Sequence, residues 1–64
     1  MEARNLIRET VYLYVGGAIN TPVMYVGTEP KGYVFKAYND STNLFDGFKN
    51  VLCGRSVREY IEEQ

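Results

Sequence analysis

Two runs of β-branched and aromatic residues decide the fold of this chain: Thr10-Val11-Tyr12-Leu13-Tyr14-Val15 and Val23-Met24-Tyr25-Val26. Between them lies Gly16-Gly17-Ala18-Ile19-Asn20-Thr21-Pro22, which is rich in turn-forming residues and is best interpreted as a long connecting loop. The Gly27 to Gly32 segment, with Pro30 inside it, is a second turn signal, and a third strand-like run, 32–38, follows it. We therefore expect an antiparallel meander of three strands, at 10–15, 23–26 and 32–38.

The stretch from Thr10 to Thr28 is uncharged over nineteen residues, which also raises the alternative of a membrane-spanning helix. Its centre, however, contains Gly16, Gly17, Asn20 and Pro22, and charges of both signs flank it. A bilayer helix would be most apolar at its centre and would show a bias of positive charge on one side. We therefore predict no association with a membrane.

Length and composition bound the remaining possibilities. A chain of 64 residues makes one domain, residues 1–64, and such a domain buries only about 60% of its unfolded surface. Cys53 is the only cysteine and histidine is absent, so neither a disulfide nor a zinc site can support the fold. Self-association is the remaining support, and we predict a cytoplasmic homodimer without a cofactor.

The register of the predicted sheet assigns its two faces. Pairing Val26 with Tyr33 across the turn places directly opposed residues on a shared face. The core face then collects Val11, Leu13, Val15, Met24, Val26, Tyr33, Phe35 and Ala37. The outward face collects Tyr12, Tyr14, Val23, Tyr25, Val34, Lys36 and Tyr38. Residues 1–9 fit either helical or strand spacing, and we favour a short helical turn or a loose lead-in.

The C-terminal third predicts two helices. After turn-forming residues at 39–43, a helical stripe recurs at Leu44, Phe45, Phe48, Val51 and Leu52, and Gly54 is placed to end this main helix. Phe48 would then be buried against Leu13 and Phe35. A capping box of Ser56 and Glu59 predicts a short final helix from about Val57, with Val57, Tyr60 and Ile61 as its apolar side. The expected fold class is α+β, with the main C-terminal helix packed on one face of the sheet.

No pattern in the chain predicts catalysis. Cys53 is the only strong nucleophile, but no histidine is present to act as its base. The predicted helix C-terminus would raise the pKa of its thiol, so we expect an inert cysteine. The acidic residues lack the spacing of a calcium loop, and Gly16-Gly17 lacks the lysine of a phosphate-binding loop. We predict that the protein is not an enzyme.

The outward tyrosines are the candidate functional surface. Four tyrosines with one lysine are too apolar for a face meant only for water, although tyrosine is also an ordinary strand residue. We predict a small intracellular protein-binding module, an adaptor or a stoichiometric inhibitor of the kind phages encode, with partner-binding residues Tyr12, Tyr14, Tyr25, Lys36 and Tyr38. The alternative is a weak RNA or single-stranded DNA binder that stacks bases on the same tyrosines. The net charge of −1 favours the protein partner.

Overall fold

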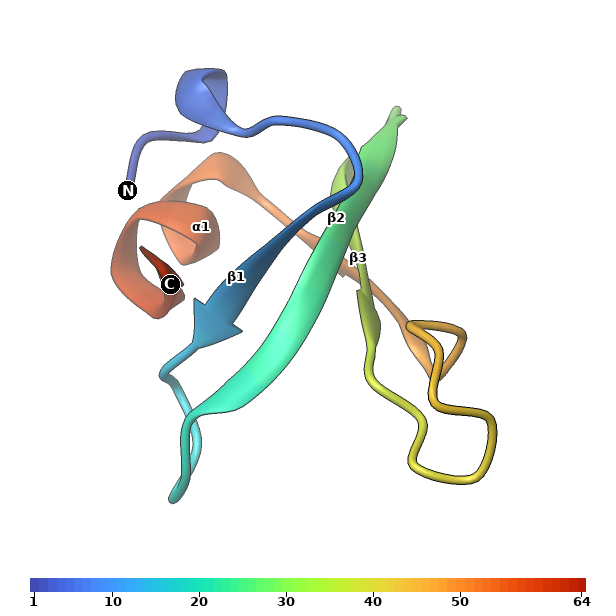
Figure 1. Cartoon of the computed structure of the whole chain (residues 1–64). Helices are drawn as coiled ribbons and strands as arrows, with labels where there is room; N and C mark the ends of the chain where they lie inside the picture. Colours follow the sequence, from blue (N-terminus) through green and yellow to red (C-terminus); the bar gives the residue numbers. More distant parts are fainter.

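The structure, a computed structural model that describes all residues from 1 to 64, is an α+β fold built on a five-stranded antiparallel sheet (Figure 1). The strand order is β4-β3-β2-β1-β5. The strands are β1 (Thr10–Tyr14), β2 (Thr21–Glu29), β3 (Gly32–Ala37), β4 (Lys49–Leu52) and β5 (Ile61–Glu63). A 3-10 turn, η1 (Ala3–Asn5), precedes the sheet, and one helix, α1 (Gly54–Tyr60), connects β4 to β5. Neither helical segment is long and apolar enough to cross a membrane.

The three predicted strands are present at the predicted places in the sequence. The second is longer than expected, because β2 begins at Thr21 and continues to Glu29. Pro22 is tolerated near its start because pairing with β3 begins only at Val23, so no ladder hydrogen bond to β3 is lost. Residues 15–20 form the expected long loop between β1 and β2, and η1 confirms a helical turn in the N-terminal lead-in.

The register between β2 and β3 differs from the predicted one. Tyr25, rather than Met24, lies opposite Phe35, and an irregularity between Tyr25 and Gly27 leaves Val26 without a partner in β3. The predicted pairing of Val26 with Tyr33 is therefore wrong. Because side chains alternate along a strand, a shift of one residue transfers a whole strand's contacts to the other face of the sheet. The bulge places Phe35 on the same face as the tyrosines.

The core is accordingly the tyrosine face, and the predicted inside and outside are reversed in β1 and β2. The buried cluster consists of Tyr12, Val23, Tyr25, Phe35, Val57 and Ile61. Leu13 and Met24, which were expected in the core, are only half-buried and alternate with these residues on the opposite face. Figure 1 shows α1 and the N-terminal segment on the same side of the β1–β2 pair. The helix that covers the sheet is thus α1, and it covers the tyrosines.

The predicted main helix is wrong. Residues 38–48 form a loop that connects β3 to β4, and the second half of the expected helix is the strand β4, paired with β3. The N–H of Gly47 donates to the carbonyl of Ala37 at 3.0 Å, and the N–H of Asn39 donates to the carbonyl of Leu44 at 2.7 Å. These bonds fold the loop back on β3, and the carbonyl of Leu44, which a helix would have paired with the N–H of Phe48, accepts from Asn39 instead. Phe48, predicted to be buried, is 89% exposed.

The final helix is present, but it begins three residues earlier than predicted. Gly54, expected to end a helix, is the first residue of α1. Val57 and Ile61 are fully buried, as the apolar side of the predicted helix required, whereas Tyr60 is 38% exposed. Ile61 also opens β5 and lies opposite Tyr14 of β1, so the end of α1 leads directly back into the sheet.

Phe35 and Phe48 make a matched pair for testing this core. Phe35 is 1% exposed at the centre of the cluster, so we expect Phe35→Ala to destabilise the protein by about 3–5 kcal/mol. For the monomer, measured in dilute protein where self-association contributes nothing, we expect Phe48→Ala to change the free energy of unfolding by no more than about 0.5 kcal/mol, because its ring makes no buried contact within the chain. Denaturant unfolding of both variants measures the difference, and equal destabilisation by the two changes would contradict this core.

Candidate functional site

The five residues predicted to bind a partner do not form one surface. Tyr12 and Tyr25 are buried in the core, 3% and 6% exposed, so their predicted outward placement is wrong. Tyr14 is half-buried, with its ring centroid 5.8 Å from that of Tyr60. Lys36 alternates with Phe35 and therefore lies on the opposite face of the sheet. Tyr38 alone lies among exposed apolar side chains, at the point where the chain leaves β3.

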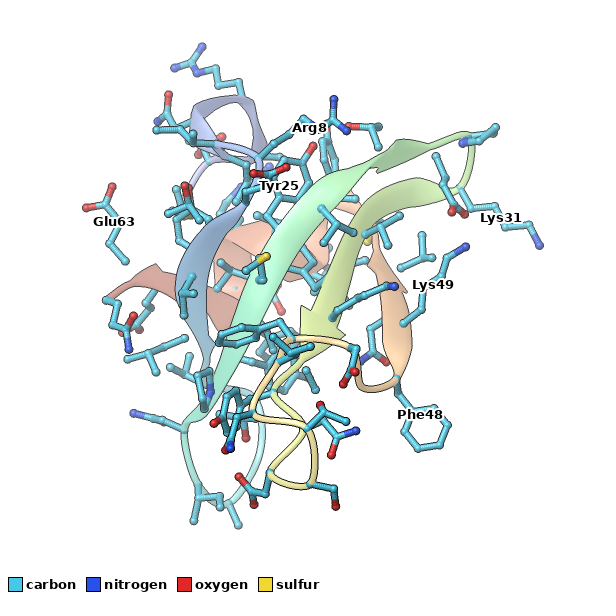
Figure 2. The ribbon with its side chains drawn as sticks, turned by 45° about the vertical axis from the view of Figure 1, so that its right-hand side comes forward. Arg8, Tyr25, Lys31, Phe48, Lys49 and Glu63 are labelled. Carbon is cyan, nitrogen blue, oxygen red and sulfur yellow. The ribbon has the colours of Figure 1, made fainter.

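Three of the seven exposed large hydrophobic residues lie close together in the sequence, at the end of β3 and on the loop before β4; the other four, Ile7, Ile19, Val51 and Tyr60, lie on other segments. Phe48 is 89% exposed, Leu44 is 60% exposed and Tyr38 is 38% exposed, while Phe45 between them is partly buried. We call these four residues, Tyr38, Leu44, Phe45 and Phe48, the loop patch. Figure 2 shows the ring of Phe48 pointing away from the protein beside β4. A contiguous apolar patch on a small protein is a candidate interaction site, whereas a single exposed apolar side chain is ordinary.

The loop patch borders an open groove of about 760 Å³. Tyr38 and Phe48 stand among its lining residues, together with Asp40, Asp46 and Lys49. The groove therefore combines aromatic surface with charged side chains of both signs.

Local hydrogen bonds hold the loop in shape. The N–H of Asn43 donates to the carbonyl of Asn39 at 2.8 Å, and the hydroxyl of Thr42 donates to Oδ1 of Asp46 at 2.9 Å. The hydroxyl of Tyr38 donates to Oδ1 of Asn43 at 2.9 Å. The ring of Tyr38 packs edge-on against the ring of Phe45, with centroids 5.2 Å apart. The loop patch thus stands on an ordered base, and Phe48 projects from it.

The strand that follows the loop patch is an edge of the sheet. β4 pairs only with β3, so the backbone groups on its other side have no partner strand. β4 is largely exposed to water, at Lys49, Asn50 and Val51. Among the other strands only the short β5 is exposed to a similar extent. On the outer face, Lys49 forms an ion pair with Glu29 of β2. An open edge of this kind can add a strand from another chain.

Cys53 is exposed and lies immediately before α1. Its Sγ lies 3.4 Å from the hydroxyl oxygen of Ser56. Hydrogen bonding by the side chain and the backbone of Ser56 lowers the pKa of the thiol. The direction is opposite to the predicted one, because the helix begins at this point instead of ending there. No three acidic or cysteine side chains gather into a group that could hold a metal ion.

The lowered pKa of Cys53 predicts the pH dependence of its alkylation. Iodoacetamide reacts with the thiolate, so we expect the rate to reach half of its maximum below pH 9.0, the ordinary pKa of the thiol. We expect Ser56→Ala to move this midpoint to higher pH, because the hydrogen bonds that favour the thiolate come mainly from Ser56. A midpoint that Ser56→Ala leaves unchanged would show that another group sets the pKa.

Comparison of the chain with protein-family models, with curated proteins and with solved structures found no match.

Proposed function

We propose that this protein is a small protein-binding module of the adaptor or inhibitor type, which contacts its partner through the loop patch and the free edge of β4. It acts by covering a surface of that partner and not by catalysis. The observation that carries the proposal is the exposure of Phe48, 89%, on a loop that local hydrogen bonds keep in shape. A single unpaired cysteine suits a reducing compartment, so we place this activity in the cytoplasm.

The energetics favour apolar contact as the basis of binding. Removing a side chain such as that of Phe48 from water contributes roughly 1.5–3 kcal/mol. The ion pair of Lys49 with Glu29 lies at the surface, and exposed pairs contribute about 0–1 kcal/mol. Phe48 and Leu44 are therefore the expected anchors of a complex, and the charges around the groove are expected to orient the partner.

A nucleic-acid partner is the weaker proposal. The loop patch offers aromatic rings on which bases could stack, and Lys36 and Lys49 are close to it in the sheet. Asp40 and Asp46, however, line the same groove, and Lys49 is already paired with Glu29. Phosphate contacts supply most of the affinity for single strands, so acidic side chains beside the rings disfavour that partner.

The double substitution Phe48→Ser with Leu44→Ser tests the proposal. We expect the variant to remain folded, because both side chains are exposed, and to lose the proteins that the immobilised wild-type chain captures from its native cell extract. Ile7→Ser is the matched control, since Ile7 is 65% exposed but precedes β1, outside the loop patch. Capture that survives in the double variant would remove the loop patch from the binding surface.

Salt separates the two classes of partner. A complex based on Phe48 and Leu44 should hold between about 50 mM and about 200 mM salt, whereas binding to a nucleic acid weakens steeply over this range. A fluorescent oligothymidine probe measures the second class directly. Tight, salt-sensitive binding of that probe, lost on Phe48→Ser, would replace the protein partner with single-stranded nucleic acid.

A further inference from the structure

A second hollow, distinct from the groove at the loop patch, opens on the core side of the sheet. It has a volume of about 230 Å³, and its lining residues come from all five strands: Tyr14, Val23, Phe35, Asn50, Leu52 and Ile61. β4 and β5 are the two free edges of the sheet, yet both contribute to this one hollow. The sheet is therefore curled so that its edges approach each other, and the hollow lies where they do not meet.

The hollow has the size and the chemistry of a site for an aromatic ring. Val23, Phe35 and Ile61 are buried and form its base, while Asn50 is exposed and stands at its mouth. Five of the six lining residues are hydrophobic. An apolar cavity of about 150 Å³ is enough to take up benzene, so this one can accept a phenyl ring.

The chain also has a phenyl ring at the same edge that is exposed to water and not packed into the core. Phe48 lies two residues before Asn50, is 89% exposed, and its ring points away from the protein (Figure 2). It is therefore placed to enter a hollow on another molecule. A projecting ring and a ring-sized hollow on one edge strand make that edge complementary to itself.

We propose that the partner at this edge is a second copy of the chain, bound about a two-fold axis with the two β4 strands antiparallel and each Phe48 ring in the hollow of the other copy. The proposal rests on the proposed protein-binding function and names its partner. A pairing centred on Asn50 places Phe48 of one copy opposite Leu52 of the other, and Leu52 lines the hollow. Directly opposed residues in antiparallel strands share a face, so the ring arrives on the core side. One symmetric contact then fills the hollows of both copies and pairs the free β4 edge of one copy with that of the other.

The charges at this edge are compatible with this arrangement. Lys49 alternates with Asn50, so it lies on the outer face beside Glu29 and need not be buried at the contact. A standard interface covers about 800 Å² of each partner, roughly a fifth of the 4500 Å² surface of this chain. Because β4 has only four residues, strand pairing alone gives a small contact, and the two Phe48 rings supply its apolar centre.

Two variants separate the projecting ring from the hollow. Phe48→Ser removes the ring and leaves the hollow open. Leu52→Trp fills the hollow from its own lining and leaves the ring in place, and residue 52 lies away from the two-fold axis, opposite residue 48 of the other copy. We expect sedimentation velocity to show a concentration-dependent dimer for the wild type and for Ile7→Ser. We expect each of the two variants alone to weaken dimerisation at least roughly 30-fold, the loss caused by removing a binding hot spot. Leu52→Phe, measured beside Leu52→Trp, fills less of the same hollow and should weaken dimerisation less.

Mixing the two variants is the decisive measurement. An equimolar mixture of Phe48→Ser and Leu52→Trp retains one ring and one open hollow for each pair, so we expect it to form heterodimers that neither variant forms as a homodimer. A mixture that stays monomeric, or a Leu52→Trp variant that dimerises like the wild type, overturns the proposal. A wild type that is monomeric but captures a different protein through Phe48 overturns the dimer and leaves the protein-binding proposal standing. Dimerisation that survives Phe48→Ser removes Phe48 from the contact altogether.

Discussion

The contact between Tyr25 of β2 and Phe35 of β3 is the interaction on which the rest of this structure depends. The two residues are paired across the strands, with ring centroids 5.4 Å apart and planes inclined by 50°. Their pairing sets the register of the central hairpin, and the register decides which face of every strand is inside. With the aromatic rings on the inner face, Val57 of α1 and Ile61 of β5 are the side chains that close over them, and both are fully buried.

A core of tyrosines imposes a second constraint, because a buried hydroxyl needs a hydrogen-bond partner. The hydroxyl oxygen of Tyr12 accepts the N–H of Ile7 at 2.9 Å, which ties the N-terminal lead-in to β1. The hydroxyl of Tyr25 lies 2.7 Å from that of Thr28, beyond the bulge at Val26. No buried polar side-chain atom is left unpaired. The bulge and the N-terminal segment therefore complete the core, although neither contributes a residue to the buried cluster.

The same arrangement leaves the loop patch outside. One face of the sheet is covered by α1 and η1, and the chain has no further helix to cover other apolar side chains. Leu44 and Phe48, which lie in the loop before β4, consequently remain exposed. The tyrosines of β1 and β2 therefore hold the fold, whereas Leu44 and Phe48, between β3 and β4, are left in contact with water.

The sequence by itself determined the α+β class, the positions of β1 to β3 and the burial of Val57 and Ile61 on α1 and β5, because alternation, turn residues and helical spacing act within a few neighbouring residues. The predicted capping box of Ser56 and Glu59 was wrong, because Cys53 is the N-cap of α1 and Ser56 lies inside the helix. Only the tertiary structure decided which face is inside and where the candidate site lies. Val11 and Leu13 fit a core face as well as Tyr12 and Tyr14 do, and the choice rests on a one-residue bulge between Tyr25 and Gly27. Gly27, with a φ of 151°, is the one local mark of this bulge, but a glycine there equally fits the start of the turn before β3. The helical stripe from Leu44 to Leu52 likewise did not form a helix. Its second half pairs with β3 instead, because the open edge of β3 offered these residues backbone partners that are distant in the sequence. Register and edge pairing are long-range properties, and from them follows the exposure of Phe48.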